Sequence, residues 1–347
     1  MRKPDPRQRK RTINLNVRKL VDGRRNAFSL KKIRENRLKL QGKPKKFRVA
    51  APEIFCLNGD NNRDELLLFF SEIKNALSHK NSKIHIDFKR TKKLLPCGTL
   101  YFRAHLNLLL DDYSHRITCG YPSDDVVGQL FQHINLLDKM GLSNKYVITA
   151  DNVKHWHSVE GVKAETMKFE NLLHSYEDEL AQPMKLGLYE SMSEAVTNCV
   201  QHAYETLNTE DSNQKWWMFA NREENVLTVA IYDAGIGIAE SLRIKPELRD
   251  IISGLAFRNS KSDKKLLSLA VGSNKTRTRL PYRGKGLPDM MQFVKSTNVG
   301  GLLIHSNCGS YMYAAHSNRE QTKHYAQALS GTLIQWTLPL IDEVNDE

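Results

Sequence analysis

The sequence predicts an α+β fold of two domains, and three patterns in the chain support this prediction. Between residues 49 and 142, segments with apolar residues at helical spacing alternate with short strand-like segments, which predicts a small α/β domain with a partly parallel sheet. Between residues 164 and 342, strand-like segments follow one another closely enough to form antiparallel hairpins. The length of 347 residues suits two domains that each bury a core.

The positive charge of the chain is concentrated in its first 48 residues. This segment holds 19 Lys or Arg against 3 acidic residues, whereas the rest of the chain holds 33 against 36. Its sparse apolar residues cannot form a core, so we predict a flexible basic arm. Such an arm attracts nucleic acid through phosphates without sequence preference, and a solubilising role or docking on an acidic surface explains its charge as well. Residues 143–163 are predicted to be a linker or crossover, and residues 343–347 an acidic tail.

Several classes of protein are excluded by composition. The five cysteines lie far apart and form no C-x-x-C pair, so neither a disulfide framework nor a zinc ribbon is expected. No apolar run approaches the roughly 18 residues of a membrane span, and the basic N-terminus is not followed by the apolar region of a secretory signal. These patterns predict a soluble cytoplasmic protein that does not bind a membrane. The irregular spacing of histidines near residues 155–157 and 305–324 predicts strand positions and not a metal centre.

A helix over residues 188–204 carries the first candidate site. Glu194, Asn198 and His202 are spaced four apart, so they advance about 40° per step and line one face of an α-helix. The opposite positions are small or apolar, as in a helix that packs on a sheet. A polar ladder on such a helix is explained either by a solvated face or by a polar ligand.

Three later segments favour the ligand. A predicted strand runs into Asp233-Ala234-Gly235-Ile236-Gly237, which places a carboxylate beside backbone that a planar ligand can approach. Arg283-Gly284-Lys285-Gly286 then forms a glycine-rich turn before a helix, where amides and basic side chains suit phosphates. Finally, Gly331-Thr332 precedes a strand. The order of the four segments is more specific than any one of them.

This order resembles the GHKL superfamily, which shares the Bergerat ATP-binding fold of a mixed sheet covered by helices. The resemblance spans residues 165–340, and the segment S-E-A-V-T-N-C-V-Q-H-A-Y is especially similar to the anti-sigma factor serine kinases. It implies ATP and Mg²⁺ as ligands. Asn198 would bind the Mg²⁺ through its side-chain oxygen, and Glu194 would be the general base. His202 would reach the phosphates or remain a helix-face histidine.

The same resemblance assigns roles to the later segments. Asp233 would accept a hydrogen bond from the adenine amino group, and Thr332 would support it through water. Gly235 and Gly237 would let the base pack on backbone. The phosphates would contact residues of the glycine-rich turn, namely Arg283, Gly284, Lys285 and Gly286. Residues 238–284 would form a long ATP lid, whose basic side chains either close over the triphosphate or remain solvated.

Residues 84–141 resemble the STAS fold of anti-sigma factor antagonists, in which a strand ending in Asp precedes a loop and a Leu-rich helix. The phosphorylatable Ser of that family is replaced here by the loop Leu95-Pro96-Cys97-Gly98-Thr99. Thr99 is a candidate acceptor, but we favour a docking domain that is not phosphorylated.

The sequence therefore leaves three functions open. The first is an ATP·Mg-binding regulatory protein that controls an unidentified protein partner by lid closure, with slow hydrolysis or phosphoryl transfer. The second is a serine/threonine kinase of anti-sigma factor type. The third is a nucleic-acid-associated ATPase that uses the basic arm. Homodimerisation is common in GHKL proteins and is an expectation by analogy.

Overall fold

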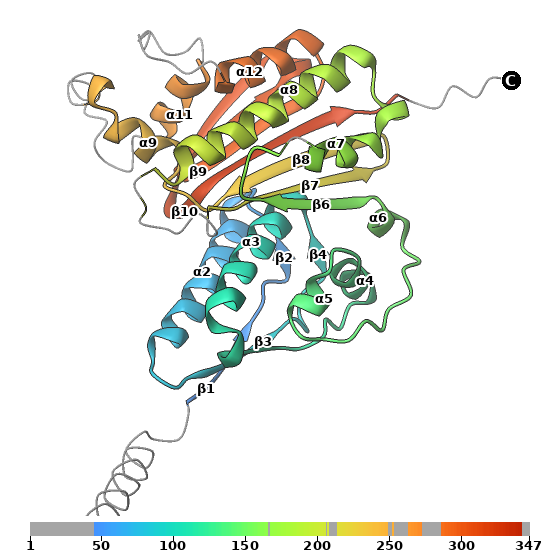
Figure 1. Cartoon of the computed structure of the whole chain (residues 1–347), viewed down its shortest axis with the longest axis vertical. Coiled ribbons are helices and arrows are strands. Elements are labelled where there is room, and N and C mark those ends of the chain that lie inside the picture. Colours follow the sequence, from blue (N-terminus) through green and yellow to red (C-terminus); the bar gives the residue numbers. More distant parts are fainter. Residues whose placement is uncertain are drawn as a thin grey trace, which may run out of the picture.

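The computed structural model describes residues 45–341, apart from residues 166, 206, 208–213, 249–251, 253–262 and 273–285 and the side chains of residues 177 and 247. Helices combine with both parallel and antiparallel sheets, so the predicted α+β class is confirmed. Figure 1 shows two halves stacked on each other, with the N-terminal half below a large sheet. Of the predicted basic arm, residues 1–44 lie outside the described residues, as do residues 342–347.

The N-terminal half is built on a three-stranded sheet of order β1-β3-β5, in which both pairings are parallel. Parallel neighbours need crossover connections, and here two long helices provide them. The elements are β1 (Lys46–Ala50), β2 (Ile54–Phe55), α2 (Asp60–Ser78), β3 (Lys83–Asp87), β4 (Lys93–Leu94), α3 (Pro96–Tyr113), β5 (Ile117–Cys119), α4 (Asp125–His133) and α5 (Leu136–Lys139). A second, two-stranded parallel sheet pairs β2 with β4.

The C-terminal half is built on a five-stranded sheet of order β6-β7-β8-β10-β9. Its strands are β6 (Trp156–Gly161), β7 (Trp216–Glu223), β8 (Val226–Asp233), β9 (Gly301–Ala314) and β10 (Arg319–Pro339). Every pairing in it is antiparallel, whereas we expected a mixed sheet. Two of the four pairings, β7 with β8 and β9 with β10, are hairpins, in which a short connection reverses the strand direction. The pairings of β6 with β7 and of β8 with β10 are antiparallel across longer connections that contain helices.

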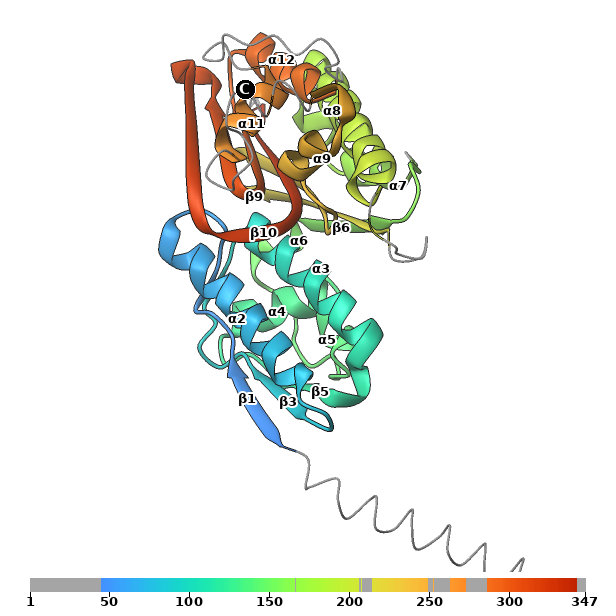
Figure 2. The same ribbon diagram turned by 90° about the vertical axis from the view of Figure 1, so that its left-hand side faces the viewer.

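Helices cover one face of this sheet (Figure 2). They are α7 (Met167–His174), α8 (Gln182–Asn198), α9 (Ile238–Ile244), α11 (Asp263–Val271) and α12 (Gly286–Thr297). A π-helical turn, η3 (Cys199–Ala203), extends α8, and α6 (Asp151–Lys154) precedes β6. Helices α8 and α12 pack closely, since a Cβ on Gly187 would lie 2.3 Å from the Phe293 ring.

The sheet is buried on both faces. Successive side chains of a strand point to opposite faces, and in β7 both sets are buried from Trp216 to Asn221. Trp216 and Met218 belong to the core under α8 and α12, whereas Trp217 and Phe219 belong to the core shared with α2 and α3. The second core is continuous across the two halves of the protein.

Polar contacts fix the junction between the halves. His105 of α3 contacts Tyr232 of β8, with Nε2 and the phenol oxygen 2.9 Å apart, and that hydroxyl donates to the carbonyl of Ser330. Arg103 of α3 donates to Oγ of Ser158 in β6 at 2.8 Å. The two halves are therefore joined by apolar packing and by buried hydrogen bonds.

Several predicted boundaries change. The arm was expected to reach residue 48, but β1 begins at Lys46 and pairs with β3. The linker predicted over residues 143–163 contains α6 and also β6, an edge strand of the large sheet. We also expected residues 302–309, 310–316 and 331–338 to be three strands of an antiparallel meander, but the first two of these segments form one continuous strand, β9.

The loop that resembles a phosphorylation site is the start of α3. Pro96 occupies the first turn of the helix, and Thr99 is fully buried, with its hydroxyl donating to the carbonyl of Leu95 at 2.8 Å. An acceptor hydroxyl must be accessible, so the alternative of Thr99 as a phosphorylated residue is not supported. In the part of the chain that the structure describes, no helix has the length and apolar character needed to cross a bilayer.

The shared core depends on Phe102. Its ring is fully buried and lies within 6.4 Å, centroid to centroid, of the rings of Phe55, Phe69, Phe70, Phe88 and Phe131. Replacing Phe102 by Ala should lower the free energy of unfolding by about 3 to 5 kcal/mol, because a cavity remains. Urea denaturation measures this loss. Leu68→Ala, at an α2 position that is 50% exposed, is the control and should cost less than about 1 kcal/mol.

Candidate functional site

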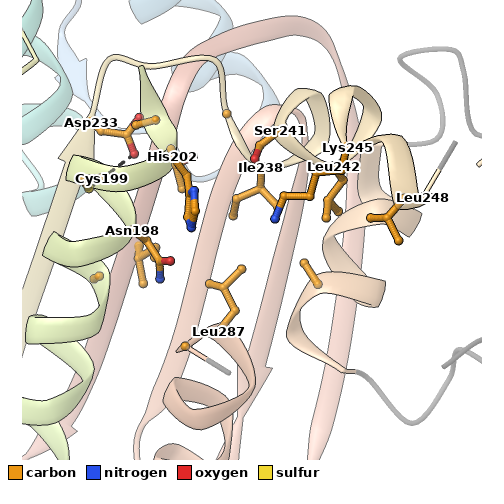
Figure 3. Close-up of a pocket in the computed structure, with 17 residues that line it drawn as sticks. Asn198, Cys199, His202, Asp233, Ile238, Ser241, Leu242, Lys245, Leu248 and Leu287 are labelled. Carbon is orange, nitrogen blue, oxygen red and sulfur yellow. Dashed lines mark hydrogen bonds between the residues drawn. The ribbon is translucent and has the colours of Figure 1, made fainter. Parts of the chain in front are cut away.

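A cavity opens between the C-terminal end of α8, the loop after β8, α9 and the start of α12 (Figure 3). The empty space between these elements, including the open space at its mouth, is about 920 Å³. Its walls are mostly apolar. They are formed by Ala195, Cys199, Ala203, Ile238, Leu242, Leu248, Ala270, Leu287 and Ile334. Polar side chains are few, so each of them identifies where a ligand would be held.

Asn198 and His202 lie in the cavity as their spacing predicts, but the helix between them is not regular. The α-helix ends at Asn198, and residues 199–203 form a π-helical turn. Single π-turns are rare and occur often at functional sites. Figure 3 shows the carboxamide of Asn198 and the imidazole of His202 both directed into the cavity, and both side chains are half-buried.

Glu194 lies beside the cavity and does not line it. Its Oε1 is 3.5 Å from Nδ2 of Asn198, a long and weak hydrogen bond. A Cβ on Gly286 would lie 2.1 Å from the same oxygen. Gly286 therefore allows the carboxylate of Glu194 to rest against the N-terminus of α12, where a helix favours negative charge.

Asp233 is the buried carboxylate of the cavity. It ends β8 with 4% of its surface exposed, and its Oδ1 accepts from the amide of Gly235 at 2.9 Å. The thiol of Cys199 lies 3.6 Å from Oδ2, and burial raises the pKa of that thiol well above its usual range. Burial also raises the pKa of Asp233 to about 6, although these donors and the amide of Thr332 oppose the shift.

The loop after Asp233 requires glycine. A Cβ on Gly235 would lie 2.1 Å from the carbonyl oxygen of Ala203, and Gly237 has a φ of +83°. The amide of Ile236 donates to that same carbonyl at 2.8 Å. Gly235 thus brings the loop against the end of the π-turn, which joins the segments of Asn198 and Asp233.

Thr332 faces Asp233 across the β8–β10 pair, and it lines the cavity. Gly331 precedes it with a φ of +84°, and a Cβ there would lie 1.9 Å from the carbonyl oxygen of Asp233. The hydroxyl of Ser306 in β9 lies 3.2 Å from that of Thr332 and accepts from the amide of Ile238 at 2.8 Å. Sequence reasoning missed Ser306, because only the strand order β10-β9 brings it to the site.

Lys245 was also missed. It follows α9, lines the cavity, and Figure 3 shows its ammonium group directed inward. The sequence indicates residues 258–285 as the source of basic side chains at the site, because Lys and Arg are frequent there. Lys245 lies outside that segment and belongs to no motif. Lys245 follows Ser241 and Leu242 by about one helical turn, and all three residues line the cavity.

The predicted glycine-rich turn is only partly described. Gly286 begins α12 and lines the cavity, whereas Arg283, Gly284 and Lys285 lie outside the described residues. The predicted lid is not a single loop, because α11 within it buries Leu266, Leu267 and Leu269. Asp263 at its start is buried, forms an ion pair with Arg243 and accepts from the amide of Cys308.

Metal ligands are sparse at this site. No group of three or more His, Cys, Asp or Glu that could hold a metal occurs within the described residues. Nε2 of His155 lies 3.8 Å from Oδ2 of Asp151 at the surface, and His157 contacts the ring of Tyr176. Of the histidines considered in the sequence, His157, His305 and His324 lie in strands β6, β9 and β10.

Taken together, the cavity has a buried carboxylate between apolar walls, and an amide, an imidazole and an ammonium group that are half-buried. This arrangement suits a ligand with one flat, hydrogen-bond-donating end and one anionic end. No protein-family model matches the chain, and no curated protein matches it significantly. The function of the cavity must therefore be argued from its geometry and from the order of the motifs.

The raised pKa of Asp233 predicts a pH-dependent stability. The folded value of about 6 lies above the unfolded value of 3.8, so the folded protein binds more protons between these pH values. Stability should fall as pH rises through this window, by up to roughly 3 kcal/mol, and then level off.

Urea denaturation of the ligand-free protein and of Asp233→Asn between pH 4 and pH 8 tests this. The wild-type stability relative to that of the variant should decrease up to about pH 6 and stay constant above it. A difference that is independent of pH would show that Asp233 is not destabilised by burial.

Proposed function

We propose that this protein is an ATP·Mg-binding regulatory protein of the GHKL type, and that its N-terminal half is a STAS-like docking domain. The observation that carries the proposal is the buried carboxylate of Asp233 between apolar walls, in one cavity with Asn198, His202, Gly237, Gly286 and Thr332. These residues come from four segments of the sequence that are distant along the chain. All of them belong to motifs whose order suggested the GHKL superfamily.

The cavity fits an adenine ring for two reasons. Small and branched apolar side chains form walls that a planar ring can lie between, and Asp233 offers a hydrogen-bond acceptor to its amino group. A guanine would present a carbonyl oxygen where adenine has the amino group, and two acceptors would then face each other. The buried acceptor therefore favours adenine over guanine, because an unpaired buried polar group is costly.

The polar side chains of the site fit a triphosphate and a magnesium ion. The imidazole of His202 and the ammonium of Lys245 are donors that suit phosphate oxygens. The carboxamide oxygen of Asn198 suits Mg²⁺, a hard cation that is usually held by few protein ligands and by substrate phosphates. When bound there, Mg²⁺ would neutralise charge on the phosphates.

Glu194 has the position of a general base. Its carboxylate is half-buried, one helical turn before Asn198, and rests against Gly286. From there it would hold the proton-accepting oxygen toward a water molecule or an acceptor hydroxyl. A protein that only sensed nucleotide would not need this carboxylate, which is why we include slow hydrolysis or phosphoryl transfer in the proposal.

Two further functions remain as outcomes of the experiments. A serine/threonine kinase of anti-sigma factor type would need a substrate other than Thr99, whose hydroxyl is buried in α3. An ATPase that works on nucleic acid would use the basic arm, and its motivation is the charge of residues 1–48. A label from γ-labelled ATP that appears on another protein would favour the kinase.

Asp233 should determine nucleotide selectivity. The purified protein should bind a non-hydrolysable ATP analogue more tightly than the matching GTP analogue, and Asp233→Asn should weaken ATP-analogue binding at least tenfold. The physical reason is that both carboxylate oxygens accept hydrogen bonds, so an amide would turn one of these positions into a donor.

Isothermal titration calorimetry measures both affinities. Asp87→Asn is the control, because Asp87 also ends a strand but lies outside the cavity, where it pairs with Arg48. If the wild-type protein binds no adenine nucleotide, or if Asp233→Asn binds it equally well, the proposed function is wrong.

Variants of Glu194 and Asn198 should distinguish residues needed for turnover from residues needed for Mg²⁺-dependent binding. Glu194→Gln should retain analogue affinity within about threefold and lower the release of labelled phosphate or its transfer by about 100-fold or more, because a base is removed. Asn198→Ala should lose the dependence of binding on Mg²⁺. Single-turnover assays with γ-labelled ATP measure the first effect, and titrations at several Mg²⁺ concentrations the second. Full turnover in Glu194→Gln would contradict its role.

A further inference from the structure

One segment of β9, residues 305–307, contacts both the N-terminal half and the loop that follows Asp233. It lies where the pairing of β9 with β10 is irregular, and Asn307 has a φ of +51°. An irregular strand turns neighbouring side chains toward different partners. We refer to residues 305–307 as the bridging segment.

The N-terminal half holds the bridging segment through Arg63 and Asn58. Nη2 of Arg63 donates to the carbonyl of Asn307 at 3.2 Å and to that of Gln327 at 3.4 Å. Nε2 of His305 lies 3.1 Å from Oδ1 of Asn58, and burial lowers the pKa of His305 to about 3, so the neutral ring donates this hydrogen bond.

Arg63 is an unusual residue for such a position. It is fully buried, yet it forms no ion pair with any of the described residues, and burial lowers its pKa. Its guanidinium lies 4.2 Å from the centre of the Tyr325 ring, and its Nε and Nη1 have no hydrogen-bond partner in the described structure. Burying a cation costs free energy unless hydrogen bonds or a ring offset the lost hydration. The free energy of burying Arg63 therefore depends on the position of the carbonyl of Asn307 in the bridging segment.

The bridging segment in turn holds the loop after Asp233. Nδ2 of Asn307 donates to the carbonyl of Ile236 at 2.8 Å, and Oγ of Ser306 accepts from the amide of Ile238 at 2.8 Å. Gly237 lies so close that a Cβ there would be 2.3 Å from Oδ1 of Asn307. The conformation of the loop therefore depends on the position of Ser306 and Asn307.

We infer that the N-terminal half controls the affinity of the cavity for its ligand, with Arg63 as a positioning residue that acts through the bridging segment. This inference rests on the proposed function, in which the ligand is an adenine nucleotide. Docking of α2 holds the bridging segment, and the held segment keeps the Asp233 loop in its binding conformation. Because coupling is reciprocal, bound nucleotide should equally stabilise the contact between the two halves.

The chain offers a matched control for Arg63. Arg103 is also a buried arginine at the junction of the two halves, with 7% of its surface exposed. It contacts Ser158 and Glu160 of β6, at the other edge of the large sheet from β9, and not the bridging segment. Methionine at either position keeps the length of the side chain and removes the charge.

The test compares Arg63→Met with Arg103→Met in the full-length protein. Arg63→Met should weaken binding of the non-hydrolysable ATP analogue about tenfold, whereas Arg103→Met should change it less than twofold. The loss of affinity in the double variant Arg63→Met with Asn307→Gly should be smaller than the sum of the losses in the two single variants, because both changes release the same segment. Equal losses in the two arginine variants, or strict additivity in the double variant, would overturn the inference.

A second measurement does not depend on nucleotide binding. Hydrogen exchange of the amides of residues 236–238 should be faster in Arg63→Met than in Arg103→Met. If the wild-type protein binds no nucleotide, the proposed function fails, but faster exchange at this loop still supports the coupling and unchanged exchange overturns it. Should Arg63→Met fail to fold, Asn58→Ala removes the acceptor of His305 and should give the same loop exchange and the same loss of affinity, about threefold or more.

Discussion

The burial of the five-stranded sheet on both faces is the constraint on which the rest of the structure depends. Trp216 and Trp217 are neighbours in the sequence, and each fills a different core. A sheet with two apolar faces must be covered twice, by α8 and α12 on one side and by α2 and α3 on the other. The N-terminal half is therefore part of the support of the cavity and not an independent module attached by a linker.

Part of the candidate site could be predicted from the sequence. Residues whose positions depend on local chain geometry were found. Asp233 ends β8, and Asn198 and His202 lie one turn apart and both line the cavity. Gly331 and Thr332 were expected just before a strand and lie inside β10, but the short Gly-Thr segment was enough to identify Thr332. The runs W-W-M-F-A and V-A-I-Y contain few polar residues, and this continuous apolar character, typical of a sheet buried on both faces, was a signal that we did not use.

Residues whose positions depend on strand order were not found. Ser306 and Asn307 reach the site because β9 lies beside β10, and Arg63 reaches it because α2 packs under that hairpin. No local pattern in the sequence encodes such pairings. Lys245 shows a related difficulty, because a single lysine after a short helix carries no periodic signal. The error at β9 arises because apolar alternation identifies strand segments but not where one continuous strand ends. β6 was missed because its six residues include only two large apolar ones, Trp156 and Val159, and show no alternation.

The shared core has a consequence for the synthesis of the protein. The apolar faces of α2 and α3 are complete before residue 114, but their cover includes Trp217, Tyr232 and Leu333. About 220 residues separate α3 from Leu333, which corresponds to roughly 10 to 40 s of translation. During that time the N-terminal half exposes an aromatic surface that the last strand will cover. The final folding step of the N-terminal half therefore waits for the C-terminal half.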